Sequence, residues 1–254
     1  MPTLVHYAVE GPVARITLDS PDNRNALSTK LVNQLHQGLT DATEETGVRA
    51  VVLDHTGGTF CAGADLAEAV GRDPGEVAVA RARELTRLLH RILKLPIPVI
   101  AAVDGHVRAG GLGLVGACDI AVAGQASTFA LTEARIGVAP SIISLTLLPK
   151  MTARAAGRYF LTGEKFGAAE AADIGLITIA ADDVKTTVAA LTAAISKGSP
   201  QGLAASKALT TASILDAFDR QADELTEQSA RLFVSEEARE GMQAFLQKRR
   251  PSWG

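Results

Sequence analysis

Short apolar segments alternate with longer amphipathic ones through the first half of the chain. Residues 4–10 and 13–19 alternate apolar and polar positions around Gly11-Pro12, which predicts a β-hairpin. Each later apolar segment is bounded by turn residues, as is typical of a buried strand. Strands and helices in alternation favour an α/β fold with a parallel sheet and helices packed outside it. Strands are expected from residue 51 and over 98–103, 118–123 and 128–130, with helices over 31–45 and 76–95.

From Ser141 onward the apolar positions follow helical spacing. Pro200 suits the first turn of one of these helices, because an N–H there would lack an intrahelical partner anyway. The 254 residues contain no internal repeat and no long linker, so we expect one unit. It would consist of an α/β core over residues 1–194 and a helical C-terminal region over 195–254. Within the second half, helices are expected over 153–161, 168–173, 182–197, 200–211 and 214–246.

Two of the apolar segments end in glycine-rich turns. The first continues through Gly57-Gly58 into residues 60–66 (FCAGADL), and the second, 98–103, continues into residues 108–111 (RAGG). Glycine and other small residues let a backbone come close to a ligand. Unpaired N–H groups at a strand end or a helix start can bind a carbonyl oxygen as it becomes anionic. The sequence therefore predicts two amide donors converging on one oxygen, with a pair of ordinary tight turns as the alternative.

Charge and cysteine content narrow the functional classes. The net charge is −3 and no extended basic cluster is present, which argues against a nucleic-acid partner. Cys61 and Cys118 lack metal-ligand spacing and favour free thiols in a reducing compartment, and the five histidines predict no metal site. We find no secretory leader and no apolar run of membrane-spanning length, so we expect a cytoplasmic protein.

Five segments carry a combined pattern: residues 23–28 (NRNALS), 60–66, 98–119, 132–137 (TEARIG) and 240–249 (EGMQAFLQKR). Taken together, they resemble the crotonase (enoyl-CoA hydratase/isomerase) superfamily. They occur in the family's order and span nearly the whole chain. The resemblance implies a spiral core of ββα units and an acyl-CoA thioester substrate, with coenzyme A entering as part of that substrate rather than as a cofactor. It also implies a homotrimer or a dimer of trimers, assembled through the helical C-terminal region.

The resemblance also assigns roles to residues. It places the oxyanion donors on the backbone N–H groups of Ala62 and Gly110, and the acid/base role on Glu133. Burial would raise the pKa of Glu133 and ease proton exchange with carbon; the alternative is an exposed glutamate paired with Arg135. Phe245 and Lys248 would meet the adenine and 3′-phosphate of coenzyme A, or else form a solvated helix end. Contact with substrate or coenzyme A is implied for Arg24, Ala26, Leu27, Ala64, Asp65, Leu66, Gly111, Phe245 and Lys248.

One position departs from the family pattern. Hydratases of the family often carry a second glutamate three residues beyond the second donor, and here that position is Gly113. One base suffices to move a proton between C2 and C4, so Glu133 alone suits a Δ3,Δ2-enoyl-CoA isomerase at least as well. Residues 131–144 and 155–169 look closest to bacterial methylglutaconyl-CoA hydratase-like members, which favours a hydratase first. A catalytically impaired binding or assembly protein of the same fold is the third hypothesis.

Three further residues have two interpretations each. Arg108 would pair with Asp104 or Asp119 outside the pocket, or would meet a distal carboxylate on the acyl group. Cys61 is interpreted as a small filler in the first donor loop. Ser141 suggests the nucleophile of a thioester hydrolase, but no base partner for it can be identified from the sequence.

Overall fold

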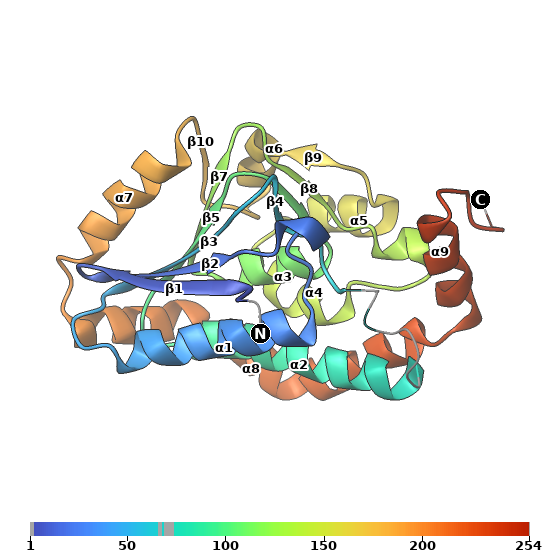
Figure 1. Cartoon of the computed structure of the whole chain (residues 1–254), viewed down its shortest axis with the longest axis horizontal. Coiled ribbons are helices and arrows are strands. Elements are labelled where there is room, and N and C mark those ends of the chain that lie inside the picture. The colour runs from blue at the N-terminus through green and yellow to red at the C-terminus, as the bar shows by residue number, and fades with distance from the viewer. Residues whose placement is uncertain (1–2, 66–67, 69–73, 254) are drawn as a thin grey trace.

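A six-stranded sheet forms the centre of the molecule (Figure 1). The computed structural model describes residues 3–65, 68 and 74–253. The first two strands form the predicted antiparallel hairpin, and every other neighbouring pair in this sheet is parallel. The strands, in their order across the sheet, are β1 (Val5–Glu10), β2 (Val13–Leu18), β3 (Ala50–His55), β5 (Val99–Val103), β7 (Ile120–Gly124) and β10 (Ile179–Ala181).

A second, smaller sheet receives the chain directly after three of these strands. β3 continues into β4 (Thr59–Cys61), β5 into β6 (His106–Arg108) and β7 into β8 (Thr128–Ala130), and these three short strands are mutually parallel. β9 (Phe166–Gly167) closes this sheet by pairing antiparallel with β8. Each of these three large-sheet strands is therefore followed by a small-sheet strand and then by helical structure, which is the expected ββα spiral.

Helices cover both faces of the large sheet. In Figure 1 α1, α2 and α8 lie together along one side, and α7 lies on the other. Strand alternation explains this: Val51 and Leu53 of β3 join the main core, whereas Val52 packs with Val188 of α7. The helices are α1 (Thr29–Glu44), α2 (Pro74–Lys94), α3 (Gly110–Ala117), α4 (Ser141–Leu147), α5 (Ala153–Thr162), α6 (Ala168–Asp173), α7 (Val184–Ile195), α8 (Pro200–Phe233) and α9 (Glu236–Leu246), with 3₁₀ turns η1 (Pro21–Asn23) and η3 (Glu133–Ile136).

The C-terminal half differs from the sequence prediction in two places. The helices expected over 200–211 and 214–246 are instead α8, which continues to Phe233, and α9, which begins after Ser235. Thr211 is buried and donates its hydroxyl to the Lys207 carbonyl, so it does not interrupt α8. Ser235 caps α9 by accepting the N–H of Ala238, and this is where the helix boundary lies. The short strands β9 and β10, like β4 and β6 earlier in the chain, were not predicted, because two or three residues carry no usable period.

Candidate active site

The two glycine-rich strand ends touch each other. Gly63, which follows β4, has a φ of +88°, and a Cβ added there would lie 2.9 Å from the Ala109 Cβ and 3.3 Å from the Gly110 nitrogen. Only glycine fits such an approach without displacing its neighbours. Gly111 is equally constrained, since a Cβ on it would lie 2.7 Å from the Cys61 carbonyl oxygen. The end of β4 and the start of α3 are therefore packed backbone against backbone.

The two predicted donor amides have different surroundings. Gly110 is the first residue of α3, and Ala109 before it holds a φ of 47° and supplies no side-chain cap. The positive end of this helix therefore begins at Gly110 without a side-chain acceptor at the N-cap. The Ala62 N–H donates to the Arg24 carbonyl over 3.1 Å. A thioester oxygen bound at Ala62 would share or replace that acceptor.

The loop before α1 packs along the first donor loop. Leu27 and Ala64 form a parallel bridge, and the Leu27 N–H donates to the Gly63 carbonyl over 2.8 Å. Asn23 donates its side-chain N–H to Asp65 over 3.2 Å. Ala26 is buried beside this bridge. The structure thus brings Ala26, Leu27, Ala64 and Asp65 together next to Ala62.

Arg24, Asn25 and Leu66 complete this region of the prediction. Arg24 is exposed, with a left-handed φ of 59°, and Leu66 lies outside the described residues. Asn25 was not singled out from the sequence, yet it is fully buried and fully bonded. Its side chain donates to the carbonyls of Thr56 (3.1 Å) and Thr59 (2.8 Å) and accepts the Ser20 N–H (2.7 Å). The sequence offers one indication of this role: asparagine tolerates the left-handed conformation, and Asn25 adopts it with a φ of 54°.

Glu133 opens the η3 turn directly after β8. Its side chain is only 7% exposed, and Oε2 is buried without a hydrogen-bond partner among the described residues. Burial raises the pKa of this carboxyl to about 7. The alternative of an exposed glutamate paired with Arg135 is wrong, because Arg135 donates to the Thr162 carbonyl over 2.9 Å instead.

Helix α9 packs on the turn that carries Glu133. A Cβ added to Gly241 would lie 2.5 Å from the Ile136 carbonyl carbon, and one on Gly137 would lie 2.6 Å from the Glu237 carbonyl carbon. The two glycines thus allow α9 and η3 to meet through their backbones. Phe245 is 58% exposed near the end of α9, and Lys248 follows the helix on the surface. Their contact with coenzyme A stays a prediction.

The position of the missing second glutamate is filled by apolar side chains. Gly113 is buried in α3, and a Cβ on it would lie 2.4 Å from Ile143 Cγ2 and 3.3 Å from Leu89 Cδ1. Ile143 itself is 2% exposed. A carboxylate at residue 113 would therefore have no room, and Glu133 has no acidic neighbour from this position.

Arg108 is bound to the small sheet. Its guanidinium donates to the carbonyls of Val107 (2.8 Å) and Thr128 (2.7 Å) and to the Thr128 hydroxyl (2.8 Å). The expected pair with Asp104 or Asp119 is wrong, and Asp119 instead pairs with Lys207 at 2.8 Å. Arg108 therefore cross-links β6 to β8.

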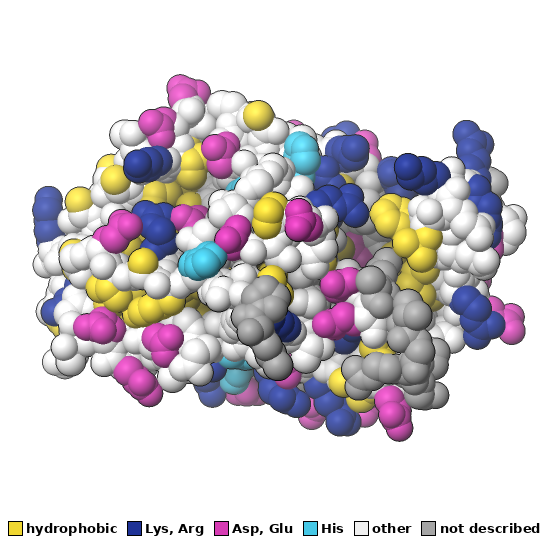
Figure 2. Space-filling view, in the orientation of Figure 1, with side chains coloured by type: hydrophobic (Ala, Val, Ile, Leu, Met, Phe, Trp, Pro, Cys, Tyr) yellow, Lys and Arg dark blue, Asp and Glu magenta, His cyan; other side chains and the backbone are white. Residues whose placement is uncertain are grey.

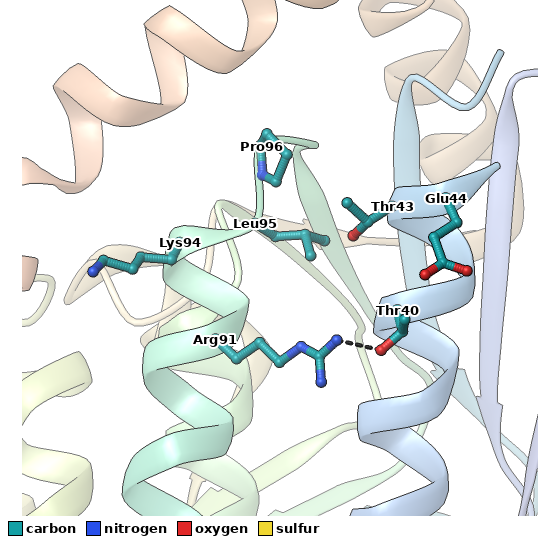
Figure 3. Close-up of a pocket in the computed structure, with 7 residues that line it drawn as sticks. All are labelled: Thr40, Thr43, Glu44, Arg91, Lys94, Leu95 and Pro96. Carbon is teal, nitrogen blue, oxygen red and sulfur yellow. Dashed lines mark hydrogen bonds between the residues drawn. The ribbon is translucent and has the colours of Figure 1, made fainter. Parts of the chain in front are cut away.

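Other candidate groups are inert or remote. Cys61 is fully buried, and burial raises the pKa of its thiol to about 12, as suits a small filler. Among the described residues, no three His, Cys, Asp or Glu side chains are grouped so as to hold a metal ion, and no helix has the length and apolarity to cross a membrane. The depression of about 250 Å³ in Figure 3 lies between α1 and α2, where Arg91 bonds Thr40, and neither the donor amides nor Glu133 line it.

Comparison with known proteins defines the class to which this fold and site correspond. The enoyl-CoA hydratase/isomerase family profile matches residues 8–254, and the chain belongs to this family. A solved structure of an enoyl-CoA hydratase from Mycobacterium avium is 65% identical, covers 100% of both chains and has a TM-score of 0.94. A solved enoyl-CoA hydratase from Mycobacterium smegmatis is 32% identical over 99% of both chains, with a TM-score of 0.80. An enoyl-CoA hydratase from Mycobacterium tuberculosis is 31% identical, covering 94% of this chain and 91% of its own.

Proposed function

We propose that this chain hydrates an enoyl-CoA thioester, with Glu133 moving the proton and the N–H groups of Ala62 and Gly110 holding the thioester oxygen. The observation that carries the proposal is the buried carboxyl of Glu133, whose Oε2 lacks a partner among the described residues and whose pKa is raised to about 7. A carboxyl that titrates near neutral pH can accept a proton in one step and return it in the next. The names of the relatives agree with this reaction.

One carboxylate is sufficient for the reaction. Glu133 takes a proton from water while the water oxygen bonds to Cβ, and the electrons of the Cα=Cβ bond move onto the thioester oxygen. Two amide donors stabilise the oxyanion formed there. Glu133 then returns its proton to Cα as the enolate collapses. Water is added across the double bond, and the carboxylate regains its starting state.

A Δ3,Δ2-enoyl-CoA isomerase is the second candidate. The observation that favours it is the apolar contact of Ile143 and Leu89 over Gly113, which leaves Glu133 without a second carboxylate from that position. An isomerase needs one base to remove a proton from C2 and return it to C4, through the same enolate. A binding or assembly protein with impaired catalysis is the third candidate, and it would keep the acyl-CoA site without the proton transfer.

Three substrates separate these functions. The purified chain is incubated with crotonyl-CoA, a 3-enoyl-CoA and 3-methylglutaconyl-CoA, and absorbance of the conjugated thioester is followed. We expect loss of absorbance with crotonyl-CoA or 3-methylglutaconyl-CoA, and a faster loss with the latter would indicate a branched, carboxylated acyl group. A gain from the 3-enoyl-CoA would indicate the isomerase. Unchanged absorbance with all three substrates, together with retained binding of coenzyme A, would indicate the third function.

The variant Glu133→Gln is the control for this experiment. Glutamine keeps the shape of the side chain but cannot exchange the proton, so we expect the rate to fall by about 10²–10⁴-fold. Binding of coenzyme A should persist, because the proposed coenzyme A contacts lie on other elements. Activity that survives this substitution would contradict the role of Glu133 in either reaction.

We further propose that the chain assembles as a homotrimer or a dimer of trimers in the cytoplasm, with Phe245 and Lys248 contacting the adenine and 3′-phosphate. Free, buried cysteines suit a reducing compartment. Figure 2 shows several Lys and Arg side chains over the end of the molecule formed by α5 and α9, which suits an anionic phosphate. The division of the chain at residue 195 stays a prediction.

A further inference from the structure

Ser141 presents a second buried polar atom without a partner in the neighbourhood of Glu133. It is the first residue of α4 and is 5% exposed. In the described part of the chain, the buried side-chain atoms that lack a hydrogen-bond partner are Tyr7 Oη, Asp54 Oδ1, Glu133 Oε2 and Ser141 Oγ. Leaving a buried hydroxyl unpaired costs about 1–3 kcal/mol, so each case requires an explanation. Of these four residues, Glu133 and Ser141 lie closest to each other in the sequence, eight positions apart.

Two tight turns hold Ser141 close to the Glu133 segment. The Glu133 carbonyl accepts the N–H groups of Gly137 and of Val138, the latter over 3.1 Å, so the chain folds back on itself. The Ser141 N–H then donates to the Ala139 carbonyl over 2.8 Å. The chain from Val138 to Ser141 spans at most about 11 Å, and the turn between Ala139 and Ser141 shortens this distance further. Ser141 therefore stays within a short reach of the turn that carries Glu133.

The contact of α4 with α3 restrains Ser141 from the other side. Ile143 Cγ2 lies 2.4 Å from the position of a Cβ on Gly113, and Gly113 is about one helical turn beyond the donor Gly110. Ser141 precedes Ile143 by two residues, at the end of α4 that begins next to this contact. The start of α4, which carries Ser141, thus lies near α3 on one side and is joined to the η3 turn by four residues on the other.

We infer that Ser141 is a positioning residue of this site, whose hydroxyl holds the water that Glu133 deprotonates. The inference rests on the proposed hydratase function. A hydroxyl both donates and accepts, so it can bind a water molecule while leaving its proton free for Glu133. Ile143 excludes a carboxylate at residue 113, and in this inference the Ser141 hydroxyl on the same helix orients the water in its place.

The test compares Ser141→Ala with Ser144→Ala. Ser144 lies on the same helix, and its hydroxyl already donates to the Ser141 carbonyl over 2.6 Å, which makes it a matched control. We expect Ser141→Ala to lower kcat for crotonyl-CoA hydration by about 10- to 100-fold, as misplacing a reactant does, with KM changed less than about twofold. Ser144→Ala should keep the native kcat. Thermal unfolding of both variants checks that the fold is intact.

Each other outcome overturns the inference in a distinguishable way. Native hydration by Ser141→Ala would remove Ser141 from the site while leaving the proposed function standing. A loss equal to that of Ser144→Ala, accompanied by a lower unfolding temperature in both, would make Ser141 a structural residue. Release of free coenzyme A by the native chain, abolished in Ser141→Ala, would make Ser141 a nucleophile instead. A native chain that hydrates none of the enoyl-CoA substrates would overturn the proposed function and this inference together.

Discussion

The carboxyl of Glu133 lies where ionisation is costly, and this sets both its chemistry and its effect on stability. Its side chain is 7% exposed, and burial raises its pKa from 4.5 to about 7. The folded chain therefore binds this proton more tightly than the unfolded chain does. The stability that the protonated group contributes is complete below about pH 4.5 and is lost as the pH rises through about 7.

Glu133→Gln should therefore stabilise the fold at alkaline pH. Glutamine stays neutral, so at pH 8 we expect its unfolding free energy to exceed that of the native chain by up to about 3 kcal/mol, at about 1.36 kcal/mol per pKa unit. The difference should shrink as the pH falls to about 5. Urea unfolding at several pH values measures it, with Glu224→Gln on the exposed face of α8 as the control. A difference that does not change with pH would show that Glu133 ionises normally.

Single residues were predicted from the sequence where a motif marks them. Glu133 and the two donor positions, Ala62 and Gly110, were identified through the resemblance, and the structure places Glu133 in a buried turn and Gly63, next to Ala62, against Gly110. Asn25 was missed, since its three hydrogen bonds reach residues that no local pattern connects to it. The Arg108 bonds to β8 were missed for the same reason.

At the scale of elements, the positions of the hairpin, of β3, β5, β7 and β8 and of helices α1 and α2 follow from hydrophobic period and, where a polar residue precedes a helix, from capping. Ser28, for example, caps α1 by accepting the Leu31 N–H. The contact of α9 with η3 has no such local signal, because it joins residues about a hundred positions apart. Gly137 and Gly241 permit this contact, but the spacing of glycines in a sequence does not predict which element packs against them.

Gly241→Ala should impair catalysis through this contact. An added Cβ would lie 2.5 Å from the Ile136 carbonyl carbon, so α9 and η3 must separate. We expect kcat to fall by at least about tenfold, because Glu133 is misplaced, and stability to fall by about 1–3 kcal/mol.

Gly157→Ala is the matched control. Gly157 lies in α5 with no atom within 4 Å of its added Cβ, so alanine there should keep the native activity and add up to about 1 kcal/mol of helix stability. Steady-state kinetics and thermal unfolding of both variants make the comparison. Equal kinetics in the two variants would show that α9 does not position the turn.

Across the whole molecule, a buried lysine joins the long helix α8 to the α/β core. Lys207 is 5% exposed, donates to the carbonyls of Ile92 (2.9 Å) and Ile97 (3.1 Å), and pairs with Asp119 at 2.8 Å. Asp119 also accepts the Val99 N–H over 2.7 Å, at the start of β5. One ion pair thus connects α8, the end of α2 and the central strands.

Lys207→Met should destabilise the whole chain. It leaves Asp119 without its cation and two carbonyls without a donor, and removing one member of a buried pair typically costs about 3–5 kcal/mol. Lys197→Met, at an exposed position after α7, should change stability by less than about 0.5 kcal/mol. Urea unfolding of the two variants measures the contrast. A small loss in Lys207→Met would show that apolar packing alone holds α8 in place.

The contact of α9 with η3 has a consequence for the stage of synthesis at which the site is complete. Translation finishes both amide loops and the Glu133 turn more than a hundred residues before it reaches Gly241. A nascent or prematurely released polypeptide ending before Glu236 would contain every group proposed for the chemistry and yet lack the helix that contacts the Glu133 turn. Activity would then depend on a helix that is synthesised well after the residues that carry the chemistry.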